Sequence, residues 1–198
     1  MVVHCASNRA KAEETRKLIE EKGGKAAVVT GDLTALVLDA SMQIRRPWQK
    51  ISLEKYQKQM TCNFYSSLRL IQLAVPHMKA QKWGRIVTIG SVQERKPHPD
   101  MLVYSASKAA QTNMAQSLAQ QLAADGITVN SVAPGVIFTD RNVEALSDPT
   151  YAAEVTASIP AGFYGEPRDC AGVVRLLLSD AARYITGQSI YVDGGKSL

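Results

Sequence analysis

The sequence has few of the residues that hold metal ions or disulfide bonds. Its three cysteines, Cys5, Cys62 and Cys170, lie far from one another, and its three histidines are equally dispersed. Metal sites and disulfide frameworks use such residues at short, regular spacings. The pattern therefore predicts neither kind of site, and it favours a reducing cytoplasm as the location of the protein.

Long apolar runs and long runs of one charge are also missing. No stretch approaches the roughly eighteen apolar residues that a membrane-spanning helix needs. Residues 1–6 lack the charged region and apolar run of a signal peptide. Lysine and arginine are interleaved with acidic residues in spite of a net charge of +5, and Arg45-Arg46 is too short for a basic patch. We therefore expect no membrane partner, no signal peptide and no nucleic-acid partner.

What the sequence does contain is the composition of an ordinary globular protein. Hydrophobic residues make up 45% of the 198 positions and charged residues 21%, which is typical of a folded, soluble chain. A chain of this length can form one sizeable core and is too short for two. We expect residues 1–198 to form a single domain.

Apolar, β-branched runs alternate with helical segments along the chain. Such alternation predicts an α/β fold with a mainly parallel sheet, in which ligands bind beyond the carboxyl ends of the strands. Expected strands cover 1–6, 26–30, 35–38, 85–91, 127–133 and 185–192, and expected helices cover 8–23, 52–81, 104–124 and 167–178, with 139–165 partly helical.

The 52–81 helix is expected to begin at a Ser52 cap and to bury one apolar face. Its apolar residues recur every three or four positions: Leu53, Tyr56, Met60, Phe64, Leu68, Ile71, Val75 and Met78. A comparable stripe in the next helix consists of Ala106, Ala110, Met114, Leu118 and Leu122.

One connection breaks the alternation. Parallel strands need a crossover of about a dozen residues or more, and almost none separate the predicted strands 26–30 and 35–38.

Tyr104 and Lys108 are the first candidates for catalysis. Residues four apart on a helix share one face, so the phenol and the ammonium can point into the same space. A tyrosine ordinarily ionises near pH ~10, and a neighbouring cation favours the phenolate, which suits acid–base chemistry. Taken alone, the spacing could equally belong to a solvated helix face.

With these segments placed, residues 2–195 resemble the classical short-chain dehydrogenase/reductases. Ser91 precedes Tyr104 by thirteen residues and Lys108 follows it by four, in the order and spacing of that family's catalytic Ser, Tyr and Lys. Asn63 matches the family's helix asparagine. Three further stretches resemble the family's nicotinamide-side loop and its last strand: 130–135 with Thr139, 185–188 and 192–195.

The resemblance implies a Rossmann-like, doubly wound parallel sheet with helices on both faces. It implies that Tyr104 exchanges a proton with the substrate oxygen, that Lys108 favours the phenolate and holds the ribose, and that Ser91 hydrogen-bonds the developing oxyanion. Asn63 would anchor a water in a proton relay. From the residues alone, Ser91 could instead cap a strand end and Asn63 could be a buried polar contact.

The resemblance also implies a set of cofactor contacts, namely Ser7, Arg9, Asp32, Asp39, Tyr104, Lys108, Pro134, Gly135, Ile137 and Thr139. The hydroxyl and guanidinium of Ser7 and Arg9 stand where an acid would bind the ribose 2′-hydroxyl of NAD, so NADP is favoured over NAD. Arg9 could equally be a solvent-facing residue at a helix start.

The sequence departs from the family at the phosphate site. The first strand and the Thr-Gly-x-x-x-Gly-x-Gly turn have no counterpart, and residues 1–3 align with the family's second strand. That turn supplies backbone N–H groups to the pyrophosphate, and losing two such bonds would weaken dinucleotide binding by about two to four orders of magnitude. Asp39 also replaces a usual asparagine, and the helix expected between residues 34 and 35 is deleted.

Two functions follow as hypotheses for what we expect to be a truncated, internally deleted family member. The first is an NAD(P)-dependent oxidoreductase acting on a carbonyl or secondary alcohol of a small metabolite. The alternative is a catalytically silent homologue that serves as an oligomerisation or binding module. In either case the resemblance implies a homodimer or homotetramer formed through helices 52–81 and 104–124.

Overall fold

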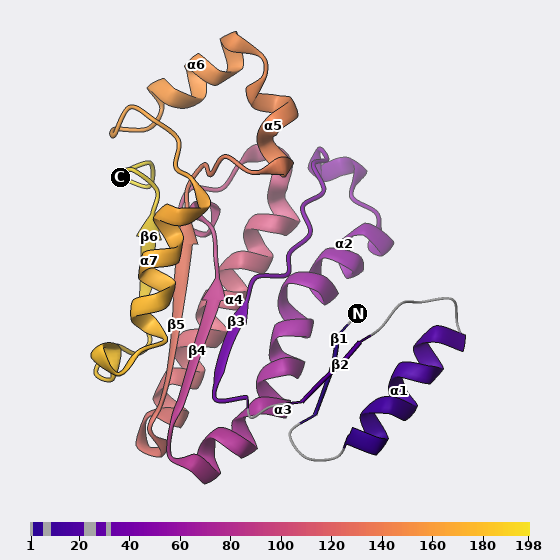
Figure 1. The fold of residues 1–198 in the computed structure, drawn as a ribbon. Helices are drawn as coiled ribbons and strands as arrows, with labels where there is room; N and C mark the ends of the chain where they lie inside the picture. Colours follow the sequence, from indigo (N-terminus) through magenta and orange to yellow (C-terminus); the bar gives the residue numbers. More distant parts are fainter. Residues whose placement is uncertain (1, 6–8, 22–26, 31–32) are drawn as a thin grey trace. The chain divides into compact units, whose positions relative to one another are not determined.

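The computed structural model describes residues 2–5, 9–21, 27–30 and 33–198 (Figure 1). The chain divides into two compact units, Met1–Thr34 and Ala35–Leu198. The single domain expected over 1–198 stays a prediction.

The first unit is a parallel β-α-β element, as the sequence predicted. It consists of β1 (Val2–Cys5), α1 (Arg9–Glu21) and β2 (Ala27–Thr30). The two strands pair in register from Val2 opposite Ala27 to Cys5 opposite Thr30. On α1, Arg16 forms ion pairs with Glu13 and Glu20, one helical turn away on either side.

The second unit contains a four-stranded sheet in the order β3-β4-β5-β6, and every pair in it is parallel. The strands are β3 (Ala35–Leu38), β4 (Gly84–Ile89), β5 (Ile127–Pro134) and β6 (Ser189–Val192). β2 pairs with β1 in the first unit, and β3 pairs with β4 in this one.

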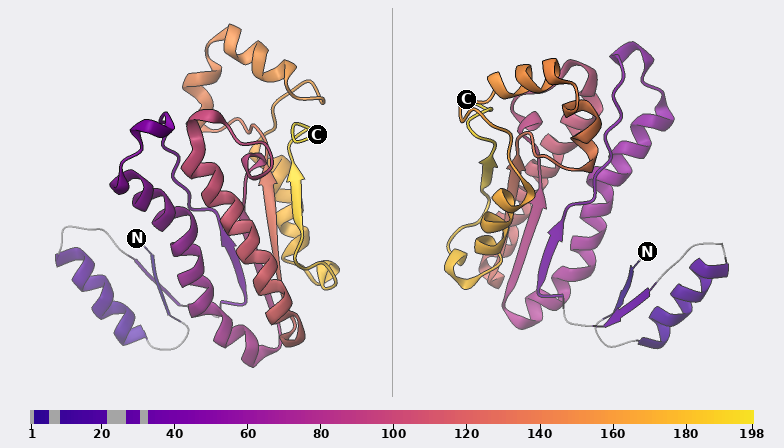
Figure 2. Two further views of the ribbon diagram at one scale, coloured as in Figure 1. Left: turned by 180° about the vertical axis from the view of Figure 1, so that it is seen from behind. Right: turned by 45° about the horizontal axis from the view of Figure 1, so that its top comes forward.

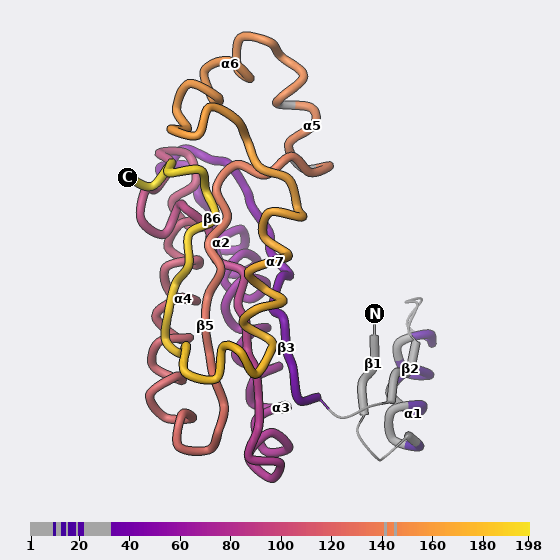
Figure 3. Tube along the Cα trace, turned by 60° about the vertical axis from the view of Figure 1, so that its left-hand side comes forward, coloured from indigo at the N-terminus to yellow at the C-terminus, as the bar shows by residue number. Residues whose placement is uncertain are grey.

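Helices cover both faces of this sheet, as the views from behind and from the side show (Figures 2 and 3). Successive residues of a strand point to opposite faces. Ser131 of β5 contacts Thr112 of α4, whereas the next residue, Val132, packs with Leu177 of α7. The predicted arrangement with helices on both faces is therefore confirmed. The helices of this unit are α2 (Leu53–Met60), α3 (Ser66–Gln81), α4 (Leu102–Leu122), α5 (Asp140–Leu146), α6 (Pro149–Ala157) and α7 (Pro167–Leu177).

The predicted helix 52–81 is helical throughout, but the first half of its buried face differs from the prediction. A π-helical turn, Thr61–Tyr65, joins α2 to α3, and Ser52 caps α2 as expected. Leu53 and Tyr56 are exposed. Ile71 and Met78 are buried as predicted, but the stripe that contains them is polar in its first half: Gln59, Asn63, Ser67, Ile71, Ala74 and Met78.

Two further expectations need correction. In α4, Ala106 is exposed, and Lys108 and Gln111 are among the buried residues that replace it in the stripe.

The last strand begins at Ser189 rather than at residue 185, because Gly187 has a φ of 72° that interrupts extended backbone. The side chain of Asn130 bonds to backbone groups on either side of this interruption. Its Nδ2 donates to the Ile185 carbonyl, and its Oδ1 accepts from the Gln188 N–H.

No helix among the described residues is both long and apolar enough to cross a membrane. Within the same part of the chain, no group of three or more His, Cys, Asp or Glu side chains could hold a metal ion.

Gly126, which follows the 3₁₀ turn Ala123–Asp125 and leads into β5, should not tolerate a side chain. Its φ is 76°, and an added Cβ would overlap the backbone carbonyl oxygen of Lys82. We expect Gly126→Ala to lower the free energy of unfolding by more than the roughly 1–2 kcal/mol that a left-handed conformation costs an alanine. Chemical denaturation would measure this loss of stability. Gly162→Ala is the matched control, because its φ is 79° but nothing lies within 4 Å of the added Cβ. Equal losses in the two variants would contradict the overlap.

Candidate active site

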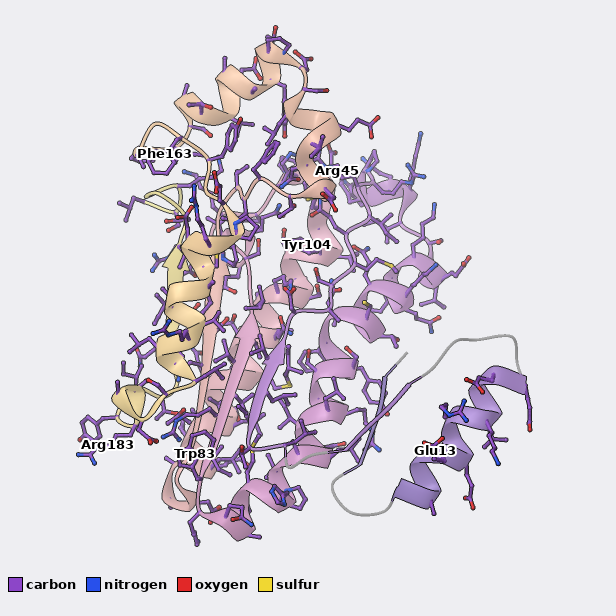
Figure 4. The ribbon with its side chains drawn as sticks, in the orientation of Figure 1. Glu13, Arg45, Trp83, Tyr104, Phe163 and Arg183 are labelled. Atoms are coloured by element: carbon purple, nitrogen blue, oxygen red, sulfur yellow. The ribbon has the colours of Figure 1, made fainter. Side chains whose placement is uncertain are left out.

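An open cleft of about 890 Å³ lies at the carboxyl ends of the strands of the second unit. Its wall includes Asp39 after β3, Ser91 after β4 and Gly135 after β5, together with Tyr104 and Lys108 from α4. Figure 4 shows Tyr104 near this end of the sheet and Trp83, which precedes β4, at the opposite end. The cleft therefore occupies the position where parallel α/β sheets bind ligands.

Tyr104 and Lys108 project from the first turns of α4 into this cleft. Their side chains approach each other, with Lys108 Nζ 5.8 Å from the centre of the Tyr104 ring. Lys108 is only 1% exposed, and its Nζ donates to the carbonyl of Ile89 at 2.6 Å and to Gln111 Oε1 at 3.4 Å. The end of β4 therefore fixes the ammonium beside the phenol.

Ser91 follows β4 and reaches the same cleft. Its Oγ accepts a hydrogen bond from the backbone N–H of Gln93 at 3.2 Å and so caps the short 3₁₀ turn Val92–Glu94. This contact uses one acceptor position of the hydroxyl, which can still donate its proton. Capping and a contact with substrate are thus compatible roles for one hydroxyl.

Asn63 is not part of the cleft wall. Its fully buried amide makes three hydrogen bonds to two residues: Oδ1 accepts from the Met42 N–H at 2.6 Å, and Nδ2 donates to the Met42 carbonyl and to Ser107 Oγ, both at 2.9 Å. Ser107 in turn donates to the backbone carbonyl of Tyr104. Asn63 therefore connects the loop after β3 to the turn that carries Tyr104, in agreement with the buried polar contact considered from the sequence. The water relay stays a prediction.

A second polar pair lies one turn further along the same two helices. Gln111 Nε2 donates to Ser67 Oγ at 2.8 Å, and both side chains are buried. Sequence reasoning missed Ser67, Ser107 and Gln111. One sequence pattern could have revealed them: Asn63 and Ser67 are polar residues four positions apart on one helix, and Ser107 and Gln111 have the same spacing on the facing helix.

The residues expected to contact a cofactor divide between the two units. Asp39, Pro134, Gly135, Ile137 and Thr139 line the cleft together with Tyr104 and Lys108. Ser7 and Asp32 lie outside the described residues. Arg9 is the first residue of α1 in the first unit, and its side chain also lies outside the described part of the structure.

The groups in the cleft fit one half of a nicotinamide dinucleotide. The cleft has the volume of a small-molecule site, and the buried Lys108 ammonium and the Asp39 carboxylate can hydrogen-bond ribose hydroxyls. The described cleft residues include no glycine-rich turn at a helix N-terminus for a pyrophosphate. The fit is therefore to the nicotinamide riboside.

A cysteine also lines the cleft, but its environment disfavours the thiolate. Burial raises the pKa of the Cys170 thiol, and the carboxylates of Asp169 and Asp39 raise it further. A thiol kept protonated is a poor nucleophile. The cleft is therefore not arranged for cysteine chemistry.

Glu94 holds the Ser91 loop in place, and sequence reasoning did not single it out. One carboxylate oxygen accepts from Thr112 of α4 at 2.6 Å, and the other accepts from Ser189 and Tyr191 of β6 at 2.7 and 2.9 Å. Burial, together with these contacts to Glu94, raises the pKa of Tyr191, so that phenol remains a donor. The carboxylate thus joins three elements just behind Ser91.

We expect Glu94→Ala to lower the free energy of unfolding by about 2–4 kcal/mol, because it leaves three partly buried hydroxyls without their acceptor. Glu94→Gln should lose less, since an amide can still accept from β6 and donate to Thr112. Urea denaturation would measure both. Glu144→Ala, at an exposed position of α5, is the control and should leave stability unchanged. If the Ala and Gln variants were as stable as the parent, the role given to Glu94 would be wrong.

Comparisons with known proteins agree with this geometry. The family model described as enoyl-(acyl carrier protein) reductase matches residues 2–197. The chain is 33% identical to 3beta-hydroxysteroid dehydrogenase 1 of Eggerthella lenta, over all of this chain and 84% of that protein. That alignment is 219 positions long, 21 more than this chain has residues, so the relative contains segments that this chain lacks.

Two further relatives are 3-oxoacyl-(acyl-carrier-protein) reductases. That of Haemophilus influenzae is 38% identical over 83% of this chain and 67% of its own length. The crystal structure of that from Agrobacterium tumefaciens, with NADP bound, shares 31% identity and a TM-score of 0.80, covering 98% of this chain and 83% of the other. The family match over nearly the whole chain and the order of Ser91, Tyr104 and Lys108 around one cleft lead to the same conclusion: the chain belongs to the short-chain dehydrogenase/reductase family of oxidoreductases.

Proposed function

We propose that this protein is an NADP-dependent oxidoreductase that interconverts a carbonyl and a secondary alcohol on a small metabolite. The observation that carries the proposal is the convergence of Ser91, Tyr104 and Lys108 on one cleft, with the buried ammonium 5.8 Å from the phenol ring. A proton donor, a cation and a hydroxyl facing one space are the groups that carbonyl reduction requires.

Tyr104 is the proposed acid and base. In reduction its hydroxyl gives a proton to the substrate oxygen, and in oxidation the phenolate takes that proton back. The positive charge of Lys108 stabilises the phenolate in both directions. Because the Ile89 carbonyl and Gln111 hold Lys108 in place, the ammonium needs little rearrangement during the reaction.

Ser91 is the proposed donor to the oxygen on which negative charge develops. Its hydroxyl proton is not used in the contact with Gln93, where Oγ is the acceptor. Glu94 supports this position by holding the loop against α4 and β6. Ser91 and Tyr104 can then both donate hydrogen bonds to the same substrate oxygen.

Lys108, Asp39 and the 134–139 segment are the proposed contacts of the cofactor's nicotinamide riboside. The cofactor, when bound, supplies or accepts the hydride. Two observations favour NADP over NAD. Ser7 and Arg9 are the residues expected near the 2′ position of the cofactor's ribose, and the Agrobacterium relative has NADP bound.

Calorimetric titration with NADPH and NADH, followed by an assay of carbonyl reduction, tests the proposal. NADPH should bind more tightly than NADH and should support reduction of at least one compound in a panel of sugar, 3-oxoacyl and steroid ketones. A folded protein that gives no heat with either cofactor at millimolar concentration would contradict the oxidoreductase and favour a silent binding module.

The homodimer or homotetramer expected from the sequence belongs to the same proposal. Several large apolar side chains on α2 and α3 are 45–69% exposed, namely Leu53, Tyr56, Leu70 and Leu73. A second copy of the chain packed along these helices would bury them. Light scattering across a concentration series would measure the oligomeric state.

A further inference from the structure

Two lysines lie side by side on the wall of the cleft, on loops that are distant in the sequence. Lys96 follows the Ser91 turn, and Lys196 follows β6. Lys96 Nζ donates to the backbone carbonyl of Lys196 at 3.0 Å, and Lys196 Nζ donates to Ser158 Oγ, just after α6, at 2.5 Å. Both ammonium groups are therefore held in place by neutral acceptors.

Neither ammonium forms an ion pair within 4 Å with any acid in the described part of the chain. Asp193 is the nearby acid, but its carboxylate accepts from the backbone N–H groups of Gly195 and Ser197. Burial and the charge of Lys96 hold the pKa of Lys196 below its ordinary value, and Asp193 only partly offsets them. The two positive charges therefore repel each other without a neighbouring acid that neutralises them.

The rest of the cleft does not balance this charge. Arg45 adds a further cation to the wall, in addition to Lys108. The acids on the wall are Asp39, which follows β3, and Asp140, the first residue of α5. An anion between Lys96 and Lys196 would relieve their repulsion and would lie on the same wall as Ser91 and Tyr104.

We propose that Lys96 and Lys196 form an anion subsite, so that the substrate is a hydroxy or oxo compound bearing a carboxylate or phosphate group away from its reacting carbon. This inference rests on the proposed function, because it places the anion within the cleft of Ser91 and Tyr104. The lysines select the substrate and take no part in proton transfer.

Matched pairs of ligands that differ only in charge test the subsite. The probes are gluconate against gluconamide, 3-hydroxybutyrate against its amide, and sorbitol 6-phosphate against sorbitol. Binding is measured by titration calorimetry and turnover with NADP as oxidant, for the parent, Lys96→Met, Lys196→Met and the double variant. Arg183→Met is the matched control: it removes one positive charge from an exposed site that is not part of the cleft wall. In Figure 4 Arg183 lies at the end of the second unit where Trp83 lies, away from Tyr104.

We expect the parent to prefer the charged member of at least one pair. Each single variant should weaken binding of that member about 10- to 100-fold, mostly as a rise in KM, while the neutral member and the Arg183→Met control change little. The carboxylate and phosphate pairs show which anion the subsite takes.

The proposal is overturned if the parent binds no charged probe, if it binds charged and neutral members equally, or if the preference survives in the double variant. Binding preference without turnover in any pair would retain the subsite and reject the proposed oxidoreductase. Turnover without a charge preference would retain the proposed oxidoreductase and reject the subsite.

Discussion

The Tyr104→Phe variant should fold normally and lose about 10²- to 10⁴-fold in kcat for carbonyl reduction with NADPH, the range that general acid catalysis by one side chain contributes. The substitution removes only the hydroxyl that carries the proton. The ring keeps its place in the wall of the cleft, where it is 6% exposed, and Lys108 keeps its bonds to Ile89 and Gln111. KM for NADPH should therefore change much less than kcat.

Tyr151→Phe is the control for this experiment, because it makes the same chemical change at another tyrosine of the same cleft. Steady-state kinetics of both variants, with circular dichroism to verify folding, would be compared with the parent. A folded Tyr104→Phe protein that retains the parent's kcat would show that another group donates the proton. Equal losses in both variants would indicate a general effect on the cleft.

The Asn63→Ala variant should lose about 3–5 kcal/mol of the free energy of unfolding, a large part of the roughly 5–15 kcal/mol typical of a domain. The fully buried amide makes three hydrogen bonds, and its removal leaves the N–H and carbonyl of Met42 without partners. The bond to Ser107 is lost as well, and Ser107 donates to the Tyr104 carbonyl. Activity should therefore fall together with stability.

Asn113→Ala serves as the comparison, since Asn113 is an exposed residue of α4. It should keep its stability within about 0.5 kcal/mol of the parent or gain slightly, because alanine has the better helix propensity. Denaturant titration of both variants measures the difference. If Asn63→Ala proved as stable as Asn113→Ala, the connection between the loop after β3 and α4 would not be structural.

The elements of the fold were largely predictable because strands and helices leave different periodicities in a sequence. β3 was predicted residue for residue over Ala35–Leu38, and α7 to within one residue of its end. The last strand was predicted too early, at residue 185. A β-rich run there is interrupted by Gly187, and whether a glycine adopts a positive φ depends on its tertiary surroundings.

The first half of the buried face of the 52–81 helix was the larger error, whereas Ile71 and Met78 are buried as predicted. An apolar stripe predicts burial only if the facing surface is apolar, and here the facing residues of α4 and of the loop after β3 offer hydrogen-bond partners. Gln59, Asn63 and Ser67 are buried because those partners replace water. No pattern within the helix alone could have revealed what it packs against.

The sequence by itself determined the α/β class, the positions of the elements and the order of Ser91, Tyr104 and Lys108, because periodicity, turn chemistry and spacing are local properties of a chain. Only the tertiary structure decided that these three side chains share a cleft with Lys96 and Lys196, that Glu94 supports the Ser91 loop and that Asn63 lies outside the cleft wall. Those relations join residues tens of positions apart. They depend on the packing of strands and helices against one another, which no local pattern records.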